Sequence, residues 1–313
     1  MRLLVTGGAG FIGSNFIHYL KKEFKSDVNI RVIDNLTYAG DLNNLDGIQS
    51  TKIDFIKGDI CDFETVSTAM VDIDYVIHFA AETHVDNSID NPMVFTNTNV
   101  IGTQVLLNAV LKSKVRKFLL ISTDEVYGSR IDGFFSEDDL LNPSSPYSAS
   151  KASSELLLKA YNKTFGVNFN ITRCSNNFGP RQHREKLIPN FIKLISESKP
   201  LTIYGDGSNL RDWIFVDDHS NAILKVMTEG RNGETYNVSG NHELSNLDIS
   251  KLLLGIMGKD ETLLQFVPDR LGHDFRYAID SNKILRELNF SPKFDFVEAL
   301  EYTINWYMSK AKL

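Results

Sequence analysis

Short apolar segments alternate with longer segments of helical spacing through the first half of the chain. The short segments are rich in β-branched and aromatic residues: Leu3–Thr6, Ile30–Asp34, Asp54–Lys57, Tyr75–Phe79, Lys117–Ser122 and Asn168–Thr172. Between them, apolar residues recur at helical intervals in Ile12–Lys22, Glu64–Met70, Pro92–Leu111 and Ser148–Thr164. Near-continuous apolar strands that alternate with helices are typical of a parallel sheet buried on both faces. The pattern predicts an α/β fold with a Rossmann-type, doubly wound sheet that binds ligands at the carboxyl ends of its strands.

The second half of the chain is less regular, because prolines and glycines interrupt it from about residue 178. Two helix starts stand out, Ser245 three residues before Asp248 and Asp295 three residues before Glu298. Both resemble capping boxes, and they predict helices over Ile249–Met257 and Val297–Met308. We therefore predict a first domain over 1–177, a smaller mixed α/β substrate lobe over 178–313, and a return to the first domain at about 212–240.

Composition narrows the classes of protein that this chain could be. Its 313 residues are 42% hydrophobic and 23% charged, which is ordinary for a folded domain and unlike a disordered chain. The formal charge of −7 argues against a nucleic-acid partner. No apolar run is long enough to span a membrane. Two cysteines, Cys61 and Cys174, form no CxxC pair, which favours a cytoplasmic location, and the histidines have no metal-binding spacing.

A glycine-rich loop lies between the first predicted strand and the first predicted helix. Within Gly7-Gly8-Ala9-Gly10-Phe11-Ile12-Gly13 the glycines allow a tight turn and close approach of a pyrophosphate to the helix N-terminus. Asp34 ends the next strand, where a carboxylate accepts hydrogen bonds from ribose hydroxyls and repels a 2′-phosphate. The loop and Asp34 predict NAD as the cofactor. Asp59, at the end of the third strand, would reach the adenine.

Tyr147 and Lys151 have the YxxxK spacing at the start of a predicted helix. Residues four apart share a helix face, so the ammonium can lie beside the phenol and a bound ribose. A neighbouring cation lowers the pKa of an acid, and the oxidised nicotinamide is itself cationic. We therefore expect the phenol to act as a base toward a sugar hydroxyl.

Three residues with reactive side chains, Thr123, Asp124 and Glu125, follow the predicted strand that ends at Ser122. Consecutive side chains of a strand point to opposite faces, so the backbone must bend here if both carboxylates serve one substrate. Two close carboxylates in a water-poor pocket have pKa values that are pushed apart. One would be a general acid and the other a general base, as elimination of water requires.

Several stretches of the chain together resemble one family from end to end: Thr6–Gly13, Asn35–Gly40, His78–Glu82, Ser122–Gly128, Pro146–Ser153, Arg173–Asn177, Gly205–Trp213 and Gly272–Tyr277. It is the family of dTDP-glucose 4,6-dehydratases, which are extended short-chain dehydrogenase/reductases and lyases of deoxysugar biosynthesis. The resemblance implies that Tyr147, with Lys151 and Thr123, takes the proton of the sugar 4-hydroxyl while C4 gives hydride to NAD. Glu125 would then remove the C5 proton, and Asp124 would protonate the departing 6-hydroxyl.

The resemblance also implies which residues bind ligands, and it implies a homodimer built on the two long helices. The cofactor would contact Gly7, Gly10, Phe11, Ile12, Gly13, Asp34, Asn35, Thr37, Asp59, Ile60, Ala80, Ala81, Tyr147 and Lys151. The nucleotide sugar would contact His84, Thr123, Asn176, Glu185, Lys186, Arg211, Asn237, Arg276 and Tyr277.

Four features depart from the family pattern: Thr83, Asn87, Phe275 and the stretch Pro180–Lys186. Most lie in segments expected to border the nucleotide sugar, so UDP-glucose or a UDP-N-acetylhexosamine stays open as an alternative substrate. A nucleotide-sugar 4-epimerase or a decarboxylase would use the same tyrosine and lysine, but neither needs a general acid at Asp124. A noncatalytic NAD sensor would not need Tyr147 or Lys151.

Overall fold

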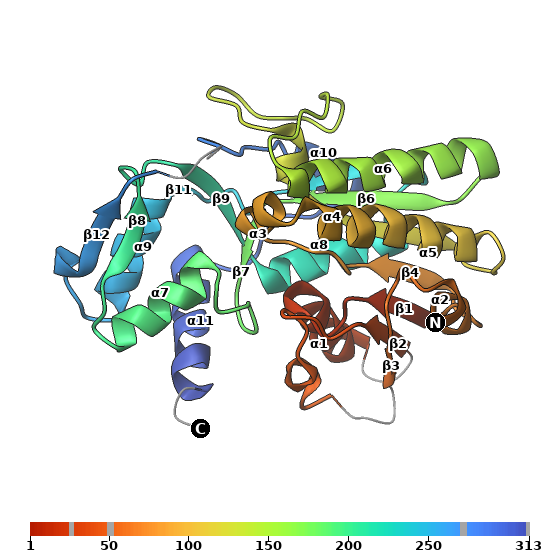
Figure 1. The fold of residues 1–313 in the computed structure, drawn as a ribbon, viewed down its shortest axis with the longest axis horizontal. Coiled ribbons are helices and arrows are strands. Elements are labelled where there is room, and N and C mark those ends of the chain that lie inside the picture. Colours follow the sequence, from red (N-terminus) through yellow and green to blue (C-terminus); the bar gives the residue numbers. More distant parts are fainter. Residues whose placement is uncertain (25–27, 49–52, 270–273, 311–313) are drawn as a thin grey trace.

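A seven-stranded parallel sheet forms the centre of the molecule (Figure 1). The computed structural model describes residues 1–24, 28–48, 53–269 and 274–310. The strand order is β10-β6-β5-β4-β1-β2-β3, with the order reversing between β1 and β4. The Rossmann-type prediction is confirmed. The strands are β1 (Arg2–Thr6), β2 (Asn29–Asp34), β3 (Ile53–Lys57), β4 (Tyr75–His78), β5 (Lys117–Thr123), β6 (Phe169–Cys174) and β10 (Thr235–Val238).

Helices cover both faces of this sheet because alternate strand residues point to opposite sides. Leu3 and Val5 belong to one apolar core, whereas Leu4 between them belongs to the other. The first core includes residues of α1 (Phe11–Phe24), α8 (Val216–Glu229) and α10 (Asn282–Leu288). The second includes residues of α2 (Phe63–Ala69), α5 (Gly102–Val110) and α6 (Pro146–Phe165). Helices α5 and α6 lie together on one side of the sheet in Figure 1.

The helix predicted over Pro92–Leu111 is not regular. It consists of α4 (Pro92–Phe95), a π-helical segment η3 (Thr96–Ile101) and α5, and the short α3 (Val85–Asp90) precedes it. π-Helical turns are rare and frequently occur at functional sites. Here the wider turn carries Asn99, which contacts Glu82 in the loop after β4. The Asn99 side-chain amide accepts a hydrogen bond from the Glu82 N–H at 2.9 Å and donates one to the Glu82 carbonyl oxygen at 3.1 Å.

The second lobe packs around its own apolar core, to the left in Figure 1. Its strands are β7 (Asn176–Phe178), β8 (Leu201–Tyr204), β9 (Leu210–Phe215), β11 (Glu243–Ser245) and β12 (Leu264–Val267), and its helices are α7 (Leu187–Ser196), α9 (Asn246–Ile256) and α11 (Phe296–Lys310). The lobe also contains the short 3₁₀ helix η5 (Glu261–Leu263), whereas another, η1 (Leu42–Leu45), lies between β2 and β3 of the first domain. Strand β10, from the segment expected to return, pairs in parallel with β6.

Both predicted helix starts in the lobe are capped. Ser245 and Asp248 form the complete reciprocal capping box of α9. Asp295 accepts hydrogen bonds from the backbone N–H groups of Val297 and Glu298 at 2.9 and 3.1 Å, at the start of α11. None of the helices within the described ranges combines the length and the hydropathy that a bilayer span requires.

Candidate active site

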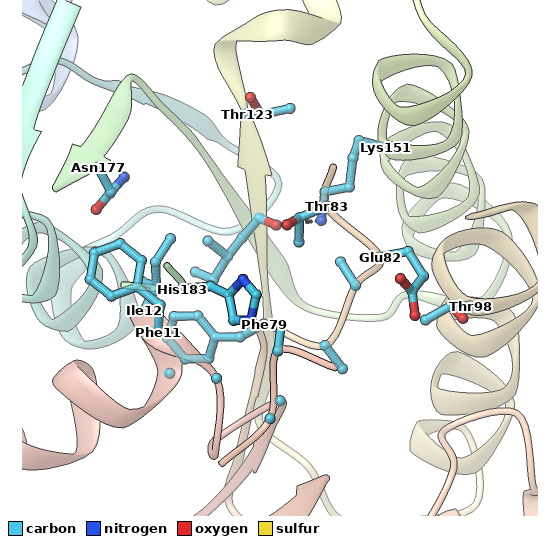
Figure 2. A pocket seen from close by; sticks show the side chains of 18 of the residues that line it. Phe11, Ile12, Phe79, Glu82, Thr83, Thr98, Thr123, Lys151, Asn177 and His183 are labelled. Atoms are coloured by element: carbon cyan, nitrogen blue, oxygen red, sulfur yellow. Dashed lines mark hydrogen bonds between the residues drawn. The ribbon is translucent and has the colours of Figure 1, made fainter. Parts of the chain in front are cut away.

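One cavity opens at the carboxyl ends of the central strands, against the second lobe (Figure 2). Thr123 and Lys151 lie in its upper part in this view, and Phe11 and Phe79 lie below them. Every residue that the sequence predicts for the cofactor lines this cavity, and so do the five predicted catalytic residues. The cavity lies at the side where the strand order reverses, which is the ligand site of open α/β sheets.

The glycine-rich loop leaves no room for side chains. Gly7 has a φ of +68°, and a Cβ there would lie 2.6 Å from the backbone nitrogen of Ala80. A Cβ on Gly13 would lie 2.4 Å from the carbonyl oxygen of Gly7. The loop therefore brings bare backbone to the N-terminus of α1, where N–H groups and the helix dipole favour an anion. This cradle fits the pyrophosphate of a dinucleotide.

Asp34 is held rigidly at the end of β2. Its Oδ2 accepts a hydrogen bond from the Ala9 N–H at 2.9 Å, and its Oδ1 accepts one from the Leu36 N–H at 2.8 Å. Each carboxylate oxygen has a further lone pair, which can accept from a ribose hydroxyl. Nearby, the Asn35 amide donates to Asp59 Oδ2 at 3.3 Å. The glycine-rich loop and the carboxylates of Asp34 and Asp59 together fit NAD.

Tyr147 and Lys151 lie in the first turns of α6, which begins with a reciprocal cap between Ser145 and Ser148. The sequence analysis missed this cap because its second residue is serine and not an acid. The Lys151 ammonium is buried and donates to the Ile121 carbonyl oxygen on β5 at 2.7 Å. Burial lowers the pKa of Lys151 to about 8, although the Glu155 carboxylate opposes this shift.

The phenol of Tyr147 departs from expectation in the free protein. Burial, followed by the charge of Glu125, raises its pKa well above the usual value, and a hydrogen bond with Thr123 opposes the rise only in part. The expected lowering of the Tyr147 pKa is therefore wrong for this structure. The physical reason is that burial disfavours the phenolate and the nearby Glu125 carboxylate adds to this effect, whereas the lysine ammonium donates to a carbonyl oxygen of β5.

The backbone bends directly after β5, as the pair of adjacent carboxylates requires. The Thr123 hydroxyl accepts a hydrogen bond from the Glu125 N–H at 3.3 Å and caps the 3₁₀ helix η4 (Asp124–Tyr127). Both Asp124 and Glu125 line the cavity that Tyr147 also lines. The turn thus replaces the alternation of a strand and gives both carboxylates access to one ligand.

Asp124 has the environment of a neutral acid. The residue is 2% exposed, and within the described structure its Oδ2 has no hydrogen-bond partner. Burial raises its pKa well above the usual value, and the charges of Glu125 and Asp212 add to the rise while Arg211 opposes it. A carboxyl group that keeps its proton near neutral pH can act as a general acid.

The residues predicted for the nucleotide sugar divide into two groups. Thr123, Asn176, Glu185 and Lys186 line the cavity. His84, Arg211, Asn237, Arg276 and Tyr277 are outside its lining. Gly272 and His273 of the predicted motif lie outside the described residues.

The second group makes contacts within the protein. The buried amide of Asn237 accepts from the Tyr127 hydroxyl and donates to two backbone carbonyls. The Arg211 guanidinium donates to carbonyls of neighbouring loops and lies 4.4 Å from the ring centroid of Tyr277. Arg276 forms an ion pair with Glu243 at 2.6 Å. His84 precedes the first residue of α3.

Some cavity residues were missed by the sequence analysis. Glu82 and Thr98 lie beside each other at the right of Figure 2, Glu82 from the loop after β4 and Thr98 from the π-helical segment. His183 comes from the segment that departs from the family pattern, and its ring meets Tyr38 edge-on with centroids 5.6 Å apart. Position just after a parallel strand could have identified Glu82, whereas only the folded chain brings His183 to Tyr38.

Comparison with known proteins assigns the family. A family model described as GDP-mannose 4,6 dehydratase matches residues 4–303. The chain belongs to this family. The dTDP-glucose 4,6-dehydratase of Streptomyces antibioticus is 47% identical over 311 residues, covering 98% of this chain and 92% of that protein. The low-salt glycan biosynthesis protein Agl12 of Haloferax volcanii is 48% identical over 309 residues, covering 98% and 99% respectively.

A solved dehydratase structure has the same fold over its whole length. DesIV, a dTDP-glucose 4,6-dehydratase from Streptomyces venezuelae with NAD and TYD bound, matches with a TM-score of 0.97 at 44% identity. The match covers 100% of this chain and 98% of DesIV. The family membership predicted from the sequence motifs is thereby confirmed.

Proposed function

We propose that this member of the dehydratase family converts dTDP-glucose to dTDP-4-keto-6-deoxyglucose, with NAD as its cofactor and release of one water. The observation that carries the proposal is the buried Asp124, which lines the cavity that Glu125, Tyr147 and Lys151 also line. The similarity of the chain to named dTDP-glucose 4,6-dehydratases over almost its full length, and to DesIV with NAD and TYD bound, supports the same activity.

The first step is oxidation at C4 of the sugar. Tyr147 takes the proton of the 4-hydroxyl, and Thr123 holds the phenol by the hydrogen bond that opposes its raised pKa. NAD, held by the glycine loop and Asp34, supplies the hydride acceptor and a positive ring that favours the phenolate. Lys151 adds a second positive charge, since a pKa of about 8 leaves its ammonium mostly protonated at neutral pH.

The second step is elimination across C5 and C6. The 4-keto group acidifies the C5 proton, which Glu125 removes, and Asp124 gives its proton to the 6-hydroxyl so that water leaves. Return of hydride to C6 and of a proton to C5 completes the 4-keto-6-deoxy sugar with no net oxidation. Asp124 suits its role because its raised pKa keeps the transferable proton in place.

The alternative reactions, epimerisation and decarboxylation, do not need a general acid beside the sugar 6-hydroxyl. An epimerase or a decarboxylase has no departing 6-hydroxyl to protonate, so neither gives the buried acid at Asp124 a function. We assign the sugar and diphosphate to the cavity residues Asn176, Glu185 and Lys186, with the nucleotide against the lobe over 178–313 and NAD on the domain over 1–177.

We further propose a homodimer and a cytoplasmic location. Met93, Ile101 and Leu156 lie on α4, η3 and α6, and these residues are 63%, 43% and 59% exposed. Apolar side chains on two adjacent helices are typical of an interface. Both cysteines carry free thiols, as expected in a reducing compartment. Sedimentation of the Leu156→Glu variant as a monomer, beside a wild-type dimer, tests the interface.

Incubation with dTDP-glucose and, separately, UDP-glucose tests the main proposal. Mass spectrometry should show the loss of one water from the dTDP sugar, with the UDP sugar converted more slowly. Formation of an epimer or of carbon dioxide, with no loss of water, would reject the dehydratase assignment. Faster conversion of UDP-glucose would keep the reaction and correct the nucleotide.

A further inference from the structure

A buried ion pair lies behind the catalytic side chains, and the mechanism above does not use it. Arg173 on β6 and Glu155 on α6 have side chains that are 1% and 0% exposed. Arg173 Nε donates to both Glu155 carboxylate oxygens at 3.1 Å, and its Nη2 donates to Oε2 at 2.7 Å. Such a forked contact fixes both distance and orientation, and removal of either partner leaves a buried charge unpaired.

The same guanidinium holds a tyrosine on a different element. Arg173 Nη1 donates to the Tyr127 hydroxyl at 2.5 Å, and the guanidinium carbon lies 4.6 Å from the Tyr127 ring centroid. The hydroxyl in turn donates to Asn237 Oδ1 at 2.8 Å on β10. The Tyr127 ring stacks on Phe135, with centroids 4.9 Å apart and planes within 7°. Tyr127 is therefore held at its hydroxyl and along its ring.

The two ends of this chain of contacts lie on the two catalytic elements. Glu155 is one turn after Lys151 on α6, so both side chains share a helix face. Tyr127 is the last residue of η4, which also carries Asp124 and Glu125. A four-residue 3₁₀ helix has little stability of its own, because nucleating a turn is costly and its hydrogen-bond geometry is poor. Its position therefore depends on contacts with other elements, among them the hydrogen bond from the Asn142 N–H to the Val126 carbonyl oxygen and the contacts of Tyr127.

We propose that Glu155, Arg173 and Tyr127 are positioning residues that set η4 against α6. They would hold the acid and base of the elimination in register with the tyrosine and lysine of the oxidation. The role rests on the proposed dehydratase function, since only a two-stage reaction on one bound sugar needs both pairs within reach of adjacent carbons. None of the three residues lines the cavity, so they act through the catalytic side chains.

Removal of the Tyr127 hydroxyl is the cleaner probe of this role. Glu155→Gln would also change the charge near Lys151, whose pKa the Glu155 carboxylate raises. Tyr127→Phe leaves the ion pair and those charges in place. Tyr236→Phe is the matched control. Tyr236 is a buried tyrosine on the outer strand β10, and its hydroxyl donates to Glu287 at 3.0 Å.

Single-turnover measurements on dTDP-glucose separate the two stages. Absorbance of the reduced nicotinamide follows oxidation, and rapid quenching with mass spectrometry follows loss of water. We expect Tyr127→Phe to keep oxidation within about 2-fold while water loss slows by about 10-fold or more, since a misplacement of about 1 Å can cost up to about 10²-fold. The 4-keto hexose should accumulate, and Tyr236→Phe should leave the ratio of the two rates unchanged.

A purely structural role predicts a different result. Both rates would then fall together with the folded fraction, and Tyr127→Phe would match Tyr236→Phe, which would overturn the positioning role. Phe135→Leu removes the stacked ring without unpairing a polar group, and it should shift the same ratio in the same direction by less. A wild-type protein that oxidises the sugar but never loses water would instead reject the proposed function.

Discussion

The tyrosine–lysine pair and the aspartate–glutamate pair are held by different kinds of structure. Tyr147 and Lys151 lie on α6, a 20-residue helix whose periodicity alone places them on one face. Asp124 and Glu125 lie on η4, a four-residue turn at the end of β5. The first pair therefore has its geometry from local structure, whereas the second needs contacts with other elements to hold its position.

Burial shifts the pKa values of Lys151 and Asp124, one residue from each pair, in opposite directions. Burial lowers the pKa of Lys151 to about 8 and raises that of Asp124 well above its usual value. Both shifts favour the neutral form, because a low-dielectric site disfavours charge of either sign. The site thus prepares a proton donor at Asp124 while leaving Lys151 charged through most of the neutral range.

The largest effect on catalysis is expected from breaking the tyrosine–lysine pair on α6. Tyr147→Phe removes the group that takes the 4-hydroxyl proton, so C4 oxidation should slow by about 10⁴-fold, at the upper end for a general base. Stopped-flow absorbance of the reduced nicotinamide measures it. Tyr161→Phe, on the same helix and bonded to Asn108 at 2.8 Å, is the control and should oxidise normally. Rapid oxidation by Tyr147→Phe would contradict the assigned base.

The next effect separates the second pair from the first. Asp124→Asn keeps the shape of the side chain but has no acidic proton, so water loss should slow by about 10²-fold. The oxidised sugar should form at nearly the wild-type rate. Rapid-quench mass spectrometry follows both species. Equal slowing of oxidation and elimination would show that Asp124 serves the whole site and not the departing hydroxyl.

A pH experiment tests the buried lysine in the cofactor-free protein. The folded state releases the Lys151 proton near pH 8, whereas an unfolded chain keeps it to about pH 10.4. Between these values the unfolded state binds more protons, so this lysine makes stability rise with pH. From about pH 7.5 to about pH 9.5, wild type should gain about 2 kcal/mol relative to Lys151→Met, at about 1.4 kcal/mol per unit above the folded pKa.

Urea unfolding at the two pH values measures this difference. Lys163→Met, also on α6 but in its exposed last turn, should keep the wild-type slope. A Lys151→Met protein whose stability changes with pH as the wild type does would show that Lys151 keeps an ordinary pKa in the folded chain.

The smallest effect is expected away from both pairs, at Asp34. Asp34→Asn removes the charge that repels a 2′-phosphate. It also replaces one of the two carboxylate oxygens, which accept hydrogen bonds from the Ala9 and Leu36 N–H groups, by an amide NH₂ group that cannot accept. Affinity for NAD should fall by about 10-fold, roughly the loss of one charge-assisted hydrogen bond, and the preference over NADP should shrink. Titration calorimetry on cofactor-stripped protein measures both. Asp54→Asn, on the adjacent exposed edge, should change neither.

Much of the first domain could be predicted because its signals are local. Strands β1 to β6 and helices α1, α2 and α6 begin and end within about two residues of the expected bounds. The π-helical turn at Thr96–Ile101 could not, since no periodicity marks a one-residue widening. The contacts of Arg211 and Arg276 were also unforeseen, because loops distant in sequence supply their carbonyl and carboxylate partners.

By itself the sequence determined the parallel sheet, the glycine cradle and the tyrosine–lysine face, because hydrophobic period, backbone freedom and helical spacing act over a few neighbouring residues. Tertiary structure decided that Asp124 stays neutral, that the Tyr147 phenol is harder to ionise than its lysine suggests, and that η4 is tied to α6 through Arg173. Desolvation and long-range charge depend on residues that meet only in the folded chain.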